Sequence, residues 1–129
     1  MEQHRFYRCG HCGNVIGLIE GSGRPLSCCG SPMEELCANA TEAAGEKHVP
    51  VVERRGSEVS VSVGSTLHPM EEKHSIRWIY LQTDRGGQRR GLHPGEAPAA
   101  KFILAPGDIP VAAYAYCNLH GLWKAEIDA

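Results

Sequence analysis

Hydrophobic and polar positions alternate in the second half of the chain, as they do in β-strands with one buried face. In the stretch SEVSVSVGS, Val59, Val61 and Val63 fall on one side and mostly serines fall on the other, which predicts a half-buried strand. The stretch IRWIYLQT, residues 76–83, is rich in aromatic and β-branched side chains and precedes the turn sequence DRGGQ. It therefore predicts a second strand.

Two more strands are predicted further along, in KFILAPGD and VAAYAYC, and the Pro-Gly-Asp between them is typical of a turn. Short strands follow one another at regular intervals, and no segment has a convincing amphipathic helical pattern. This arrangement favours an antiparallel sandwich or barrel, so the expected class is all-β.

The first 38 residues differ from the rest, because they carry five of the six cysteines and little that could form a core. So short a piece generally needs a staple such as a metal ion to fold. Within it, NVIGLIE and RPLSCC flank GSG and predict a hairpin. The small, polar stretch ANATEAAGEK that follows is interpreted as a linker. We therefore expect a module over 1–38 and a β-domain over 39–129.

Composition and charge exclude several classes of protein. The chain has 129 residues, is 42% hydrophobic and 22% charged, and carries a net charge of -2. These values are normal for a soluble globular protein, and an extended nucleic-acid surface would need an excess of Lys and Arg. The start, MEQHRFYRC, lacks the apolar core of a signal peptide, and no apolar run approaches the roughly 20 residues of a membrane span. We expect a cytoplasmic protein that binds neither nucleic acid nor membrane.

The cysteine pattern indicates a metal site and not disulfides. Cys9 and Cys12 form a CxxC, whereas Cys28 and Cys29 are adjacent, and adjacent cysteines rarely bridge each other because the bond strains the backbone. Four thiolates complete a tetrahedral set for Zn(II) or for a single Fe, and spacing leaves these two metals open. The remaining cysteine of this region, Cys37, is interpreted as a small apolar filler or a partly exposed thiol.

A second set of candidate ligands comes from three segments of the β-domain: His48, His68, His74, Cys117 and His120. Any one of these histidines alone could be an ordinary surface or core residue. Together, four imidazoles and one thiolate exceed the four ligands of a structural zinc and suit iron or copper. An octahedral ion held by five such ligands keeps one position open for chemistry. Glu46 and Lys47 directly precede His48, so a carboxylate and an ammonium can reach that open side.

Two other readings compete with a redox centre. A zinc-stapled binding module, with incidental histidines, would be colourless. A non-haem iron oxygenase typically uses two histidines and one carboxylate and keeps several open positions, whereas five protein ligands leave only one.

Four stretches together resemble one family closely: YRCGHCGNVI with LSCCGSPMEEL, EKHVPVVE, HPMEEKHSIRWIYL, and YCNLHGLWKAEI. They are similar to the desulfoferrodoxins, the two-iron class of superoxide reductases, over essentially the whole chain. The resemblance implies a desulforedoxin-like iron module, an immunoglobulin-like β-sandwich and a homodimer. It favours iron over zinc at the four-cysteine site.

The resemblance also implies roles for individual residues. Cys9, Cys12, Cys28 and Cys29 would hold the first iron. At the catalytic iron, the four histidines would be equatorial ligands and Cys117 the axial one. The implied reaction is the one-electron reduction of superoxide to hydrogen peroxide. We expect Lys47 to attract the anionic substrate and Glu46 to shield the oxidised site and aid product release.

An external electron donor is implied as well, a rubredoxin-like protein or a reductase, because the chain has no GxGxxG fingerprint for a flavin or nicotinamide. The sequence departs from the family pattern at His11, Ser75, Arg77 and Cys37. None of these changes removes a ligand, and Arg77 affects only the expected charge near the site.

Overall fold

The structure is a computed structural model that describes residues 3–128. The chain forms two compact units, Met1–Cys37 and Ala38–Ala129. The boundary expected from the sequence lies one residue later, after residue 38.

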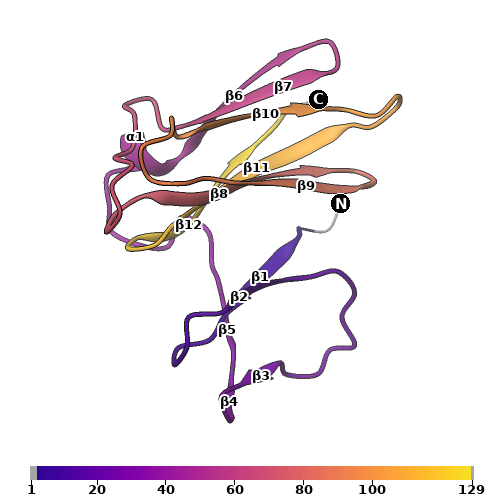
Figure 1. The fold of residues 1–129 in the computed structure, drawn as a ribbon. Helices are drawn as coiled ribbons and strands as arrows, with labels where there is room; N and C mark the ends of the chain where they lie inside the picture. The colour runs from indigo at the N-terminus through magenta and orange to yellow at the C-terminus, as the bar shows by residue number, and fades with distance from the viewer. Residues whose placement is uncertain (1–2, 129) are drawn as a thin grey trace. The chain divides into compact units, whose positions relative to one another are not determined.

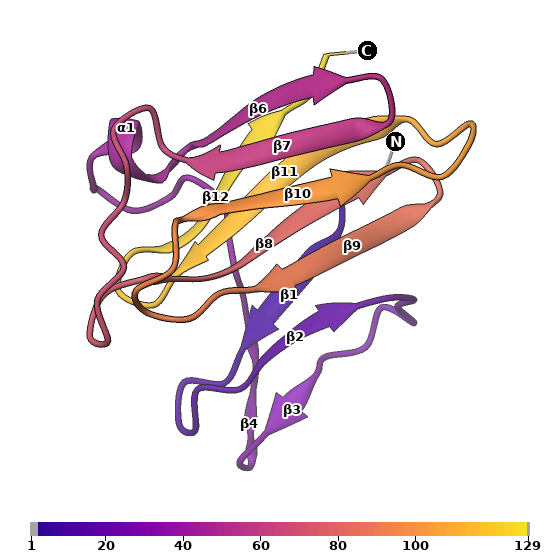
Figure 2. The same ribbon diagram turned by 45° about the horizontal axis from the view of Figure 1, so that its top comes forward.

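The second unit consists of two antiparallel sheets that face each other as a sandwich (Figure 2). The three-stranded sheet has the order β10-β7-β6, with bounds Ala99–Ile103, Glu58–Val63 and Pro50–Arg55. The four-stranded sheet has the order β12-β11-β8-β9, with bounds Gly121–Glu126, Pro110–Cys117, Ile76–Thr83 and Gly86–Gly91. The all-β class predicted from the sequence is confirmed.

The core lies between these sheets and follows the alternation read from the sequence. Val59, Val61 and Val63 of β7 are at most 1% exposed. Ile79 and Leu81 of β8 are fully buried and belong to the same cluster. Because alternate residues of a strand point to opposite faces, the serines between the valines of β7 lie on the outer face. The four strands predicted in this unit are all present.

The structure adds one helical turn that the sequence pattern did not predict. Residues Gly45–His48 form α1, which lies in the sequence between the start of the second unit and β6. Among the described residues this turn is the only helix, and it is far too short to cross a lipid bilayer.

The first unit is a small set of short strands (Figure 1). One sheet has the order β2-β1-β5, with bounds Val15–Leu18, Arg5–Arg8 and Glu34–Glu35. A separate ribbon pairs β3 with β4, Ser27–Cys28 and Ser31–Pro32.

The hairpin predicted across GSG is wrong. β2 pairs with β1, with Arg5 opposite Leu18 and Arg8 opposite Val15, and β3 pairs with β4. The turns that reverse the chain are those that carry the cysteines. Gly13, at φ +82°, donates its N–H to the Cys9 carbonyl at 3.0 Å and folds β2 back onto β1. The GSG segment therefore only connects two hairpins.

The stretch interpreted as a linker is in fact fastened to the second unit. The Asn39 side chain donates to the carbonyl of Lys124 at 3.1 Å and accepts its N–H at 2.9 Å. The Thr41 hydroxyl donates to the carbonyl of His120 at 2.8 Å. Small polar side chains satisfy backbone groups of β12 and of the turn before it, which composition alone did not reveal.

Candidate metal centres

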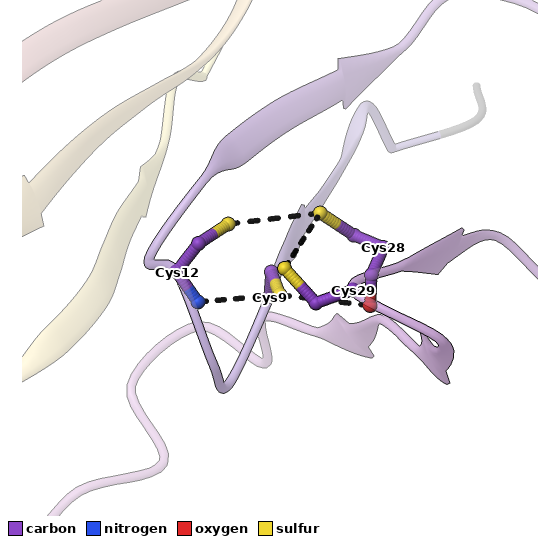
Figure 3. Close-up of side chains that lie close together, drawn as sticks. All are labelled: Cys9, Cys12, Cys28 and Cys29. Carbon is purple, nitrogen blue, oxygen red and sulfur yellow. Dashed lines mark hydrogen bonds between the residues drawn. The ribbon is translucent and has the colours of Figure 1, made fainter.

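The four cysteines of the first unit converge on one point (Figure 3). Their sulfur atoms all lie within 4.8 Å of one another. The Sγ atoms of Cys12 and Cys28 are 3.6 Å apart, and those of Cys28 and Cys29 are 4.0 Å apart. Sulfurs bound at about 2.3 Å around one tetrahedral ion lie about 3.8 Å from each other. The cluster therefore has the dimensions of a four-thiolate metal site.

Backbone and side-chain N–H groups turn toward these sulfurs. The N–H of Cys12 points at Cys9 Sγ at 3.5 Å, and Asn14 Nδ2 donates to Cys28 Sγ at 3.7 Å. Cys29 adopts φ +53°, a left-handed conformation that is rare for residues other than glycine. This strained backbone lets two adjacent residues direct both sulfurs to the same point.

The four thiols do not ionise alike. The backbone N–H groups of Cys12 and His11 lower the pKa of Cys9 to about 6. Hydrogen bonds shared with Cys12, Cys9 and Cys28 raise the pKa of Cys29 to about 12. Cys9 thus ionises more readily than Cys29, and a cation that replaces the shared protons favours the thiolate form of the ligands.

The second candidate centre lies at one end of the sandwich, where separate segments bring five side chains together. His48 is the last residue of α1, and His68 and His74 lie in the connection from β7 to β8. Cys117 ends β11, and His120 occupies the turn before β12. The structure thus brings together all five residues predicted for this site.

The four imidazoles form a closed circuit. Ring centroids lie 4.7 Å apart for His48 and His68, 4.7 Å for His68 and His74, 5.1 Å for His74 and His120, and 4.9 Å for His120 and His48. Each pair meets edge to face, with interplanar angles from 77° to 88°. Each ring therefore has two neighbours, as four ligands arranged in a square would have.

The facing ring atoms have spacings suited to one ion. His48 Nε2 lies 3.2 Å from His68 Nε2 and 3.1 Å from His120 Nδ1. Two nitrogens bound at about 2.1 Å and at right angles lie about 3.0 Å apart. The ligand atoms of His48, His74, Cys117 and His120 all lie within 4.8 Å of one another. Cys117 is fully buried, and its sulfur is 3.9 Å from His120 Nδ1.

Two of the rings are oriented by backbone carbonyls. His48 Nδ1 lies 2.7 Å from the Ala44 carbonyl, and His68 Nδ1 lies 2.6 Å from the Pro69 carbonyl. A proton on Nδ1 in each ring leaves the lone pair of Nε2 facing the centre.

The environment of His68 and His74 favours the neutral imidazole, which is the form that binds metals. Burial, together with the neighbouring histidines, lowers the pKa of His68 to about 4. Burial also lowers the pKa of His74. His74 Nε2 is buried without a hydrogen-bond partner among the described residues, a costly arrangement that a metal ion would relieve. The residues present therefore fit a bound ion.

Neighbouring residues that the sequence reading missed support the ligands. Trp123 stacks on His48 with a centroid distance of 4.8 Å, and its Nε1 donates to the His120 carbonyl at 3.2 Å. A Cβ added at Gly64 would lie 2.3 Å from the Glu46 carbonyl oxygen. The absence of a side chain at Gly64 thus lets the end of β7 approach α1 closely enough to position His48. Trp123 lies two residues after the CNLHG stretch, but its contact with His48 has no signal in the sequence.

The other predicted site residues are also placed. Glu46 and Lys47 lie in α1 with exposed side chains, directly before buried His48. The Glu46 carbonyl is held by the N–H of Thr66 at 2.8 Å and the hydroxyl of Ser65 at 3.2 Å. Cys37 is a free, exposed thiol outside both clusters.

Comparison with known proteins identifies the family. Residues 1–36 match the model for the desulfoferrodoxin N-terminal domain, and residues 40–126 match the desulfoferrodoxin model. A desulfoferrodoxin of Nitratidesulfovibrio vulgaris is 46% identical over 124 residues, covering 96% of this chain and 97% of the relative. A superoxide reductase of Pyrococcus horikoshii is 39% identical, covering 64% of this chain and 87% of the relative.

A solved structure agrees with these matches. The crystal structure of the superoxide reductase from Treponema pallidum has a TM-score of 0.82 and 35% identity, covering 97% of this chain and all of that one. The resemblance read from the sequence is confirmed: the chain belongs to the desulfoferrodoxin family.

Proposed function

We propose that this protein is a superoxide reductase that holds two iron ions and reduces superoxide by one electron to hydrogen peroxide. The observation that carries the proposal is the closed circuit of four imidazoles with the buried sulfur of Cys117 beside it. Relatives and a structural neighbour named as superoxide reductases support it.

The ligand assignment is part of the proposal. His48, His68, His74 and His120 would be the equatorial ligands of the catalytic iron, and Cys117 the axial one. The four cysteines of the first unit would hold the other iron. A ferrous ion held there would supply the electron for the reaction. The two protons that hydrogen peroxide requires would come from water, since the neighbouring Glu46 and Lys47 side chains are exposed to solvent.

Lys47 is proposed to attract the anionic substrate. It is exposed and directly precedes a ligand of the catalytic iron, so its charge raises the encounter rate even on a protein of net charge -2. Lys47→Ala is expected to slow the reaction with superoxide about tenfold and to flatten its dependence on ionic strength. Pulse radiolysis over a salt series measures both effects.

Lys101→Ala is the matched control, because Lys101 is an exposed lysine in β10, outside all ligand loops. It removes the same charge and should leave the rate within about twofold. Equal rates for Lys47→Ala and the unchanged protein would remove Lys47 from this role.

Glu46 is proposed to shield the oxidised site and to aid product release, not to be an indispensable proton donor. Its side chain is exposed, so water can deliver protons at the same place. Glu46→Ala is expected to retain turnover within about tenfold, a smaller loss than the roughly 10²–10⁴-fold expected when an essential general acid is removed. Steady-state assays with a saturating donor measure this. Abolished turnover in a protein that keeps its iron would contradict the assignment.

The proposal includes partners and a place of action. An external donor, a rubredoxin-like protein or a reductase, would return one electron per cycle, and the four-cysteine iron is a candidate relay. We also propose a cytoplasmic homodimer. Light scattering on the purified protein tests the oligomeric state, and a monomer at micromolar concentration would contradict it.

Iron analysis combined with optical spectra tests the ligand assignment. Two irons per chain are expected, with sulfur-to-iron bands from both centres after oxidation. A colourless protein that contains only zinc would instead support a zinc-stapled binding module.

A further inference from the structure

Asn118 lies between two proposed ligands, Cys117 and His120, and binds the loop that carries a third. Its Oδ1 accepts the N–H of Ser75 at 3.0 Å, and its Nδ2 donates to the carbonyl of Lys73 at 2.9 Å. Its backbone N–H also points at the Ser75 carbonyl at 3.3 Å. One carboxamide thus binds the peptide groups on both sides of His74.

His74 needs this support more than the other imidazoles do. The rings of His48 and His68 are each oriented by a backbone carbonyl at Nδ1. His120 is held through its carbonyl, which accepts from Thr41 and Trp123. No comparable bond orients the His74 ring among residues 3–128, and its Nε2 is buried without a partner.

The backbone around His74 explains how a distant side chain can place this ring. His74 exchanges two hydrogen bonds with Glu71, at 2.9 and 3.2 Å, which close a tight turn. That turn is local and does not connect the loop to β11. Backbone contacts join the two segments only from Ser75 onward, through the Asn118 N–H and the pairing of Ile76 with Cys117. The Asn118 carboxamide adds side-chain bonds on both sides of His74, so it helps to set the distance from His74 to Cys117 and His120.

We propose that Asn118 is a positioning residue that fixes His74 against the thiolate-bearing loop and so sets the metal affinity and the reduction potential of the catalytic centre. The inference rests on the proposed function, because it takes His74 and Cys117 as ligands of one iron. Partners beyond the direct ligands typically contribute a factor of about 10–100 in metal affinity.

The test is the rate at which the iron-loaded protein yields catalytic iron to a ferrous chelator, followed with the midpoint potential and the Cys117 sulfur-to-iron band. Asn118→Ala is expected to speed iron loss about 10–100-fold, to shift the band and to change the potential. The four-cysteine iron, followed by its own absorption, should be retained as in the unchanged protein. Asn118→Asp keeps an acceptor for the Ser75 N–H but loses the donor to the Lys73 carbonyl. Its rate of iron loss should therefore lie between those of the unchanged protein and Asn118→Ala.

Asn39→Ala is the matched control. The Asn39 carboxamide also accepts one N–H and donates to one carbonyl, but both belong to Lys124 and flank no ligand. Asn39 has φ +59°, so alanine there adds backbone strain. Asn39→Ala should therefore destabilise the fold at least as much as Asn118→Ala does. If Asn39→Ala loses iron as fast as Asn118→Ala, the effect is general destabilisation and the proposal fails.

The result also separates this inference from the proposed function. Unchanged iron retention, band and potential in Asn118→Ala, with iron present in the parent protein, overturn only the role of Asn118. A parent protein that binds no iron at the histidine cluster overturns the proposed function, and the inference with it.

Discussion

Replacing Cys117 with serine is expected to remove superoxide reduction and the sulfur-to-iron band of the catalytic centre while leaving the four-cysteine centre intact. Cys117 ends β11, is fully buried, and provides the only sulfur of the second cluster. A serine hydroxyl fits the same space but is a poorer and harder donor to the ion. Residues that only contact the ligands already contribute factors of about 10–100 to metal affinity or activity. Loss of a ligand itself should therefore lower activity by more than about 100-fold.

Cys37→Ser is the control for this change, since Cys37 is an exposed thiol that belongs to neither cluster. It should retain both absorption bands, both irons and full activity. A Cys117→Ser protein that keeps the band and the activity would show that the thiolate is not a ligand, and the axial assignment would be wrong.

Replacing the proposed metal ligand Cys9 with serine is expected to unfold the first unit without unfolding the second. Among the described residues of this unit, the buried hydrophobic side chains are those of Phe6 and Cys9. A piece of fewer than about 40 residues usually needs a metal or disulfides to fold, and structural metal binding contributes on the order of 10–16 kcal/mol. Cys9→Ser should therefore remove most of the free energy that orders β1 and β2.

Hydrogen exchange measures this effect strand by strand. In Cys9→Ser, the amides of β1, β2 and β5 should lose protection, while those of β7, β8 and β11 should retain it. Optical spectra should distinguish the two variants. Cys9→Ser should lose the absorption of the four-cysteine centre and keep that of the catalytic centre, whereas Cys117→Ser should keep the first and lose the second. Retained protection in β1 of metal-free Cys9→Ser protein would show that this unit folds without its ion.

The strands of the second unit were predictable because their signal is local. Burial of Val59, Val61 and Val63 follows from a two-residue period, and the Pro-Gly-Asp turn separates two strands as expected. Pairing in the first unit was not predictable in the same way. Turn residues in GSG suggested a hairpin, but the tight turn from Cys9 to Gly13 determines which strand meets β1.

The candidate ligands were predictable from residue type and spacing, but their arrangement was not. Nothing in the positions of four histidines fixes a closed edge-to-face circuit, which depends on loops from α1, the β7–β8 connection and the β11–β12 turn. The contacts of Asn118 and Trp123 that support the ligands join distant segments. Neither a short polar residue in a turn nor an aromatic residue in a strand carries a signal for such a partner.

Product stoichiometry tests the central claim most directly. The reduced, iron-loaded protein is mixed with a known amount of superoxide, and both hydrogen peroxide and dioxygen are measured. One-electron reduction gives one hydrogen peroxide for each superoxide consumed and no dioxygen from the substrate. A yield of one hydrogen peroxide and one dioxygen for every two superoxide ions is that of dismutation, which superoxide also undergoes without a catalyst, and would mean that the histidine–cysteine centre does not perform the reduction.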